Sequence, residues 1–106
     1  MNARRVHKLM REQFPAFDAA AMDWVNVADT EGPRIDTLRS LLAKNVGSAD
    51  VIVEVHRKMG AVLSLEEAAS FVAAHIGEGE VKVANREFSG FVVVARSGVA
   101  CGWQVK

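Results

Sequence analysis

The sequence predicts one α+β domain spanning residues 1–106, in which three or four N-terminal helices pack on a C-terminal three-stranded antiparallel β-meander. Apolar residues recur at helical spacing up to about residue 76, and from Glu80 onward the period changes to two. Ser89-Gly90 and Ser97-Gly98 divide this last segment into three strands. A chain of 106 residues, half of them hydrophobic, has the usual size of a domain with one core.

Residues 3–13 are predicted to form an amphipathic helix. Val6, Leu9 and Met10 recur at helical spacing, and Asn2 can act as the N-cap. The polar side of this helix is basic, because no acidic residue occurs among the first eleven. Its cations are Arg4, Arg5, Lys8 and Arg11.

Two further helices are expected in the first half of the chain. Pro15 suits the first turn of a helix, so Phe17 and Trp24 are predicted to line the apolar side of a second one. Pro33 follows capping residues and precedes an apolar stripe, which predicts a third helix that Gly47 can end. The stripe consists of Ile35, Leu38, Leu41 and Leu42.

Residues 49–58 fit two interpretations. As a strand, valines alternate with other residues, and β-branched side chains favour this conformation. As a helix, Ser48 is the N-cap and Gly60 follows the last turn. We predict a helix, because the signals at both ends agree with the placement of the charges.

Ser64-Leu65-Glu66-Glu67 is a capping box, and it predicts the start of a helix over residues 64–76. Leu65, Ala68 and Ile76 lie on its buried stripe, and Gly77 ends it.

The pattern of the last segment also predicts which residues share a face of the sheet. A three-residue loop, Arg96-Ser97-Gly98 with Gly98 left-handed, unites the large apolar residues of the second hairpin on one face. A similar loop at residues 88–90 adds Val81 and Val83 to that face. Its other members are Phe91, Val93, Ala95, Val99, Cys101, Trp103 and Val105.

Composition limits the cellular setting and the partners. Thirteen basic residues equal thirteen acidic ones, so no net field attracts nucleic acid or anionic lipid. Cys101 is the only cysteine, and neither a signal peptide nor a membrane span is evident. We therefore expect a cytoplasmic protein with no membrane partner. Abundant Ala and Val, with more Arg than Lys, are typical of a GC-rich bacterial genome.

No motif predicts a catalytic residue, a metal site or a cofactor. Cys101 is expected in the core, and His7, His56 and His75 fall on separate elements without metal-ligand spacing. No glycine-rich loop precedes a helix as phosphate binding requires. We interpret the chain as non-enzymatic, and a small enzyme using His56 or Cys101 stays as an alternative.

Nucleic-acid binding is a further alternative. Helices followed by a hairpin are similar to a winged helix-turn-helix, but the helix at residues 64–76, which would enter the groove, has no Arg or Lys and begins with two acids. Weak binding would depend on the basic N-terminal helix, through Arg4, Arg5, Lys8 and Arg11.

The favoured hypothesis is a small non-catalytic protein-interaction module, such as an inhibitor, adaptor or accessory subunit. The middle strand, residues 90–95, is apolar on both sides, so the reverse face of the sheet needs a cover. Either helices wrap that side too, or it forms an apolar patch for a protein partner or for self-association. The charged N-terminal helices are a second surface for a partner. Residues of the reverse-face patch would be Ala84, Arg86, Val92, Val94, Ala100 and Gly102.

Overall fold

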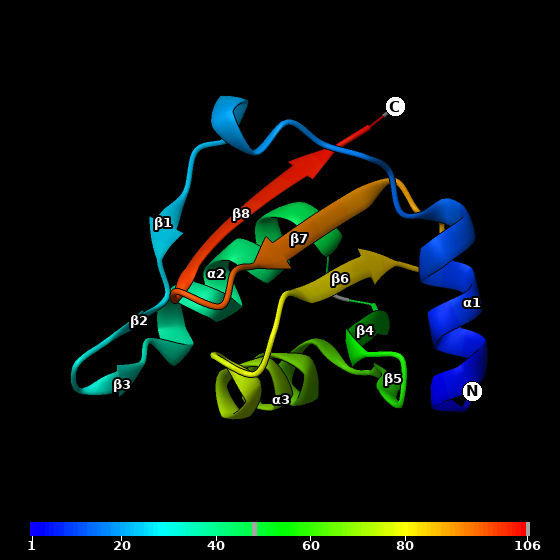
Figure 1. Cartoon of the computed structure of the whole chain (residues 1–106), viewed down its shortest axis with the longest axis horizontal. Helices are drawn as coiled ribbons and strands as arrows, with labels where there is room; N and C mark the ends of the chain where they lie inside the picture. Colours follow the sequence, from blue (N-terminus) through cyan, green and yellow to red (C-terminus); the bar gives the residue numbers. More distant parts are fainter. Residues whose placement is uncertain (48, 106) are drawn as a thin grey trace.

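The computed structural model describes residues 1–47 and 49–105 and shows an α+β chain in which helices and strands alternate (Figure 1). The helices are α1 (Ala3–Gln13), the 3-10 helix η1 (Ala19–Ala21), α2 (Ile35–Val46) and α3 (Leu65–His75). The strands are β1 (Val25–Asn26), β2 (Ala28–Asp29), β3 (Gly32–Pro33), β4 (Val51–His56), β5 (Met59–Leu63), β6 (Val81–Asn85), β7 (Gly90–Val94) and β8 (Val99–Gln104).

The predicted three-stranded meander behind a group of N-terminal helices is wrong. Within the described residues the main sheet has six strands in the order β1-β8-β7-β6-β4-β5, and every neighbouring pair is antiparallel. β6, β7 and β8 do form a meander, but the sheet continues on both sides of it. β2 and β3 form a separate two-stranded ladder.

The helix predicted over residues 49–58 is also wrong, and the strand interpretation is correct. β4 pairs with β5 on one side and β6 on the other, so that Val53 lies opposite both Ala61 and Val83. Five of its six residues are buried. A helix cap contributes about 1 kcal/mol, whereas each buried Val or Ile contributes about 1.5–3 kcal/mol. Burial on two faces therefore outweighs the local capping signals.

The second N-terminal helix, expected to follow Pro15, is replaced by an extended segment that contains only η1. Tertiary packing accounts for the difference. The rings of Phe14 and Phe17 lie 5.9 and 5.1 Å from that of Trp103, which draws this segment across one face of the sheet. Trp24 is held locally, because its indole N–H donates to the carbonyl of Ala19 at 2.8 Å.

Three of the predicted helices, α1, α2 and α3, are confirmed. Asn2 caps α1, since its side chain accepts a hydrogen bond from the Arg5 amide at 2.9 Å. The capping box of α3 is present in both directions between Ser64 and Glu67. α2 begins at Ile35, two residues after Pro33, and Gly47 is its C-cap.

The register of the second hairpin is confirmed and that of the first is wrong. Gly98 has φ 93°, and Phe91 lies opposite Trp103 as predicted. In the first hairpin Val83 lies opposite Val92, so Val81 and Val83 occupy the other face. The loop of this hairpin spans residues 86–89, because Phe88 adopts a left-handed conformation (φ 54°). Nothing in the sequence predicts this conformation.

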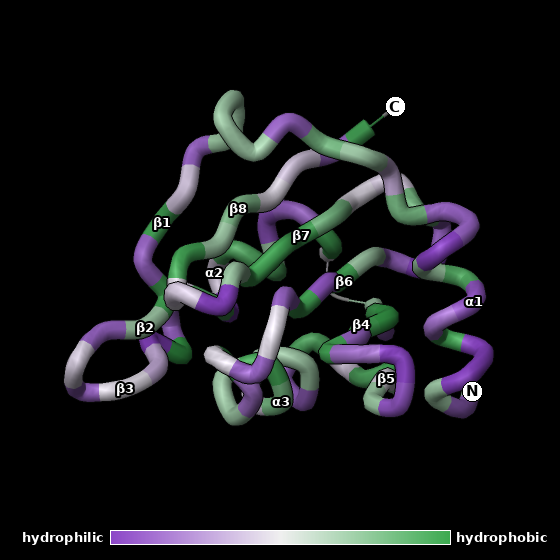
Figure 2. The backbone as a smooth tube through the Cα atoms, viewed as in Figure 1, coloured by the Kyte–Doolittle hydropathy of each residue, from purple (hydrophilic) through white to green (hydrophobic). Residues whose placement is uncertain are grey.

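Helices cover both faces of the sheet. α2 and α3 pack on one face and bury the larger apolar cluster, which includes Val53, Val83, Val92 and Val94. α1 packs on the opposite face over a smaller cluster formed with Ile52, Ala84 and Phe91. Figure 2 shows the consequence in the hydropathy of the backbone, with an apolar β7 in the middle and many polar residues along α1.

α2 approaches the sheet closely at two glycines. A methyl group on Gly90 would lie 1.9 Å from the backbone oxygen of Asn45, and one on Gly102 would lie 2.3 Å from its side-chain nitrogen. Asn45 is 8% exposed, and its amide group donates to the carbonyl of Leu41 at 2.9 Å. The C-terminal turn of α2 therefore rests directly on the backbone of β7 and β8.

This contact predicts different responses to two similar substitutions. Gly102→Ala should lower the free energy of unfolding by about 1–3 kcal/mol, because the new methyl group meets a side chain. Asn45→Ala should recover part of that loss in the double variant. Gly90→Ala should cost more and show no recovery, because its methyl group meets the backbone of Asn45. Urea denaturation measures all five variants, and equal recovery at both glycines would contradict the contact.

Candidate functional site

The six residues predicted to form the reverse-face patch are not brought together on one surface. Val92, Val94 and Ala100 are fully buried in the cluster beneath α2 and α3. Gly102 lies against Asn45, and Ala84 faces the other side, in the cluster beneath α1. Arg86 is exposed in the β6–β7 loop. Of the two alternatives for the reverse face of the sheet, cover by this chain's own helices is therefore the correct one.

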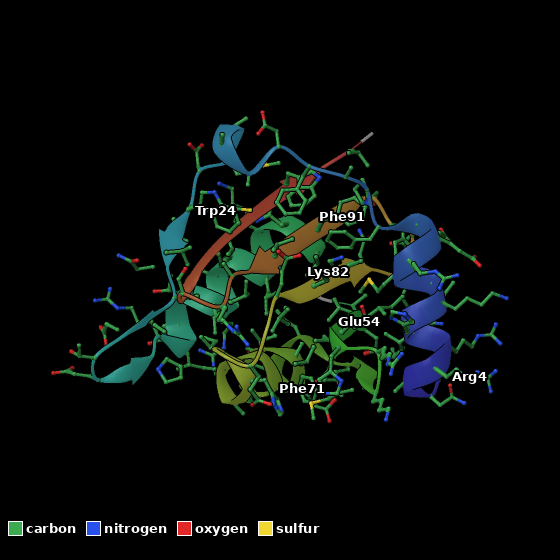
Figure 3. The ribbon with its side chains drawn as sticks, viewed as in Figure 1. Arg4, Trp24, Glu54, Phe71, Lys82 and Phe91 are labelled. Atoms are coloured by element: carbon green, nitrogen blue, oxygen red, sulfur yellow. The ribbon has the colours of Figure 1, made fainter. Side chains whose placement is uncertain are left out.

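The four cations named for the nucleic-acid alternative do share one element. Arg4, Arg5, Lys8 and Arg11 are all exposed on α1. Figure 3 shows Arg4 on the solvent side of that helix.

The residues of the enzymatic alternative lie apart. His56 is on β4 and Cys101 on β8, with β6 and β7 between them, a separation of about 14 Å at the usual spacing of strands. Cys101 is 1% exposed, and burial together with the charge of Glu80 raises the pKa of its thiol. The pKa shift disfavours the nucleophilic thiolate. In residues 1–47 and 49–105 no three His, Cys, Asp or Glu side chains gather as a metal site would require.

A histidine–carboxylate contact that the sequence did not predict joins α1 to the sheet. Glu54 projects from β4 and is 8% exposed, and its Oε2 lies 2.9 Å from Nδ1 of His7. Lys82 lies opposite Glu54 on β6, and its Nζ lies 5.3 Å from the centre of the Phe14 ring. Figure 3 shows Glu54, Lys82 and Phe91 along one side of the sheet. These polar groups hold α1 in place on this face.

The strongest candidate for binding is the outer edge of β5, which we call the β5 edge. β5 is the last strand of the sheet and pairs only with β4 among the described strands. Its five residues, Met59–Leu63, are partly exposed and include no charged residue and no proline. An edge strand of this kind presents unpaired backbone N–H and C=O groups to any extended chain that approaches.

One side of the β5 edge is bounded by the first turn of α1. α1 crosses β5 at Gly60, where an added methyl group would lie 2.7 Å from Val6. It then passes Glu54 of β4 and reaches Phe91 of β7 at Phe14. Residues 2–5 precede the crossing point. Because Val6 faces the sheet, Arg4 lies on the solvent side of the helix (Figure 3), and Arg5 is exposed as well. Neither forms an ion pair within the described part of the chain.

The other side of the β5 edge is bounded by α3. A shallow hollow of about 590 Å³, which we call the α3 hollow, lies where β5 joins this helix. Its lining residues are Leu63, Glu66, Glu67, Ser70 and Phe71. Hydrogen bonds from the backbone and hydroxyl of Ser64 lower the pKa of Glu67, so this rim of the hollow stays anionic.

The β5 edge was missed in the sequence because β5 itself was not predicted. The capping signals placed residues 49–58 in a helix, and Gly60 was interpreted as its end. The alternation of Val51, Val53 and Val55 is the one signal that pointed to the correct hairpin.

Comparisons with known proteins add no assignment. No protein-family description, curated protein or solved structure matches this chain. Among the described residues, no helix combines the length and the apolar character needed to cross a membrane.

The environment of Cys101 predicts slow thiol chemistry in the folded protein. Because burial raises its pKa, the thiol should remain protonated at pH 8 and react with iodoacetamide at least about tenfold more slowly than in 8 M urea. Mass spectrometry of quenched samples gives both rates. Equal rates in folded and unfolded protein would contradict this burial.

The contact between His7 and Glu54 predicts a non-additive effect on stability. His7→Ala leaves a buried carboxyl group without this partner and should lower the free energy of unfolding by about 1–3 kcal/mol. Replacing both residues by Leu should cost less than the sum of the two single Leu variants. Chemical denaturation measures the coupling, and strict additivity would show that the pair contributes nothing.

Proposed function

We propose that this chain is a non-catalytic protein-binding module that takes up an extended segment of a partner along the β5 edge. The open, uncharged edge of β5 carries this proposal. Natural sheets commonly protect such an edge with lysine, proline, a bulge or a covering element. Here the irregular pairing lies between Glu54 and His56, at the turn of the hairpin, and leaves Gly60–Leu63 in regular register.

Strand addition suits this edge better than the other end of the sheet. At that end β8 is partly capped by β1, through Val25 opposite Ala100 and Asn26 opposite Val99. At β5, main-chain hydrogen bonds would supply affinity, and the α3 hollow would receive a side chain of the added strand. This is the pairing mode in which an extended peptide extends an existing sheet.

The alternatives receive less support from the geometry. The cations of α1 stand in a chain whose formal net charge is zero, whereas nucleic-acid binding is dominated by neutralisation of phosphates. The enzymatic alternative would need an accessible catalytic group at His56 or Cys101, but Cys101 is buried and the pKa of its thiol is raised. A protein partner at β5 requires neither condition.

Peptide display tests the proposal with a defined probe. A library of random twelve-residue peptides is selected on the full chain, and each binder is measured again on Ala61→Lys. The lysine places a charge on the β5 edge, so we expect affinity to fall by at least about tenfold. Ala43→Lys, on the exposed side of α2, is the matched control and should bind as the wild type does, because α2 packs on β7 and β8.

Amide hydrogen exchange tests the same pairing at β5 without a substitution. A selected peptide should slow exchange of those amides in Met59–Leu63 that do not already bond to β4. Thermal melts monitored by circular dichroism establish that Ala61→Lys is folded. Binders that tolerate Ala61→Lys and leave exchange at β5 unchanged would overturn the proposal.

A further inference from the structure

The α3 hollow lies on the side of α3 that faces the β5 edge. α2 packs on β7 and β8, whereas α3 packs on β4 and β5, so α2 flanks α3 on the side away from this edge. Arg39 of α2 marks that side, because its Nε lies 2.9 Å from a carboxylate oxygen of Glu66 on α3. Phe71 follows Glu66 by five residues and therefore projects from the other side of α3, about 140° around the helix. There it lines the hollow together with Leu63 of β5 (Figure 3).

The hollow adjoins the smallest side chain on the α3 side of β5. Met59 and Leu63 pack in the larger apolar cluster, beneath α3, whereas Val62 packs in the cluster beneath α1. Because side chains alternate along a strand, Ala61 lies on the α3 side, between Met59 and Leu63. Its single methyl group leaves room between these two longer side chains, and the half-buried ring of Phe71 borders Leu63 in the hollow. A side chain opposite Ala61 on an added strand would therefore meet an apolar surface.

One carboxylate of the hollow lacks a cation. Glu66 pairs with Arg39, but Glu67 forms no ion pair within the described part of the chain. The capping box holds the Glu67 side chain in place, since its Oε1 accepts a hydrogen bond from the Ser64 amide at 3.1 Å. The residue is exposed to solvent. A fixed and accessible carboxylate beside an apolar surface is suited to contact a cation of a bound chain.

Resting on the proposed function, we infer that the partner segment is an extended chain that carries a large apolar side chain with lysine or arginine two positions away. The apolar side chain would lie opposite Ala61 and contact Phe71. The cation would lie opposite Leu63, near Glu67. The two share a face, because residues two apart on a strand point to the same side. Glu66 and Glu67 would repel an acidic residue at the second position.

A second copy of this chain does not fit the same pattern. Its β5 strand, Met59–Leu63, contains no lysine or arginine. Antiparallel pairing of two β5 strands about a two-fold axis, with Ala61 opposite Ala61, would place Met59 of one copy opposite Leu63 of the other. The position that calls for a cation would then hold methionine. A different protein is the occupant that the charges favour.

Four synthetic peptides test the inference directly. Each has seven residues, blocked ends and a fluorescent label. The first has leucine at the centre, lysine two positions away on each side and threonine elsewhere, so that it presents the same pattern in either chain direction. The second moves both lysines next to the leucine, which places them on the opposite face. The third has glutamate in place of lysine, and the fourth has serine in place of leucine.

Fluorescence anisotropy on the full chain measures the four affinities. The first peptide should bind about fivefold more tightly than the second and about tenfold more tightly than the third and the fourth. Added salt should weaken the preference over the glutamate peptide, because exposed charges are screened. The preference over the serine peptide should persist in salt, because it depends on burial of the leucine.

Glu67→Gln identifies the carboxylate responsible. Glutamine can also complete a capping box, so α3 should remain folded while the charge is lost. We expect the affinity for the first peptide to fall about three- to fivefold and the affinity for the glutamate peptide to rise. Glu87→Gln removes the same charge from the exposed β6–β7 loop and should bind as the wild type does. Thermal melts establish that both variants are folded.

The outcomes separate this inference from the proposed function. Equal binding of the four peptides, all of it lost in Ala61→Lys, would overturn the apolar–basic pattern while supporting strand addition. Tight binding of the first peptide that survives Ala61→Lys and leaves amide exchange in Met59–Leu63 unchanged would overturn strand addition and this inference together.

Two further results would also decide against the inference. Absence of binding by all four peptides would overturn it, since the first contains every feature that it requires, whereas the displayed library still tests strand addition. A dimer in light scattering that Ala61→Lys dissociates would show that a second copy is the occupant.

Discussion

The apolar character of the central strands on both faces is the constraint on which the rest of the structure depends. β7 is buried at all five positions, and β4 at five of six. A sheet of this kind needs a layer on each side, and a chain of 106 residues has three α-helices among its described residues to supply both. α2 and α3 serve one face, whereas α1 and the aromatic segment after it serve the other. All three α-helices pack on the two faces of the sheet, so none of them covers the edge strand β5.

Capping and turn residues predicted an element correctly where burial did not favour a different conformation. The N-cap at Asn2 and the box at Ser64 located α1 and α3, and Gly98 identified the loop of the second hairpin. Residues 49–58 had equally good caps and still formed a strand. The difference lies in pairing with β6, which comes thirty residues later and which no local pattern contains.

The candidate site was harder to predict than the fold, because it is defined by partners that are distant in the sequence. Val6 and Leu63 come to lie at the same edge strand only after α1 has crossed β5 and β5 has turned into α3. The apolar character of residues 90–95 predicted that the reverse face of the sheet has a cover, either this chain's own helices or a partner. In the structure α2 takes that position through its contacts with Gly90 and Gly102.

Gly60 has a role that exceeds the crossing of one helix over one strand. Since no side chain stands there, α1 can rest on the backbone of β5, and the height of its first turn above the sheet is set by a missing methyl group. That height also sets the space above the position next to β5, where an added strand would pair. A larger residue at Gly60 would meet Val6 and push the first turn of α1 away from the sheet. Gly60 therefore helps to determine how large the side chains of a strand paired with β5 can be.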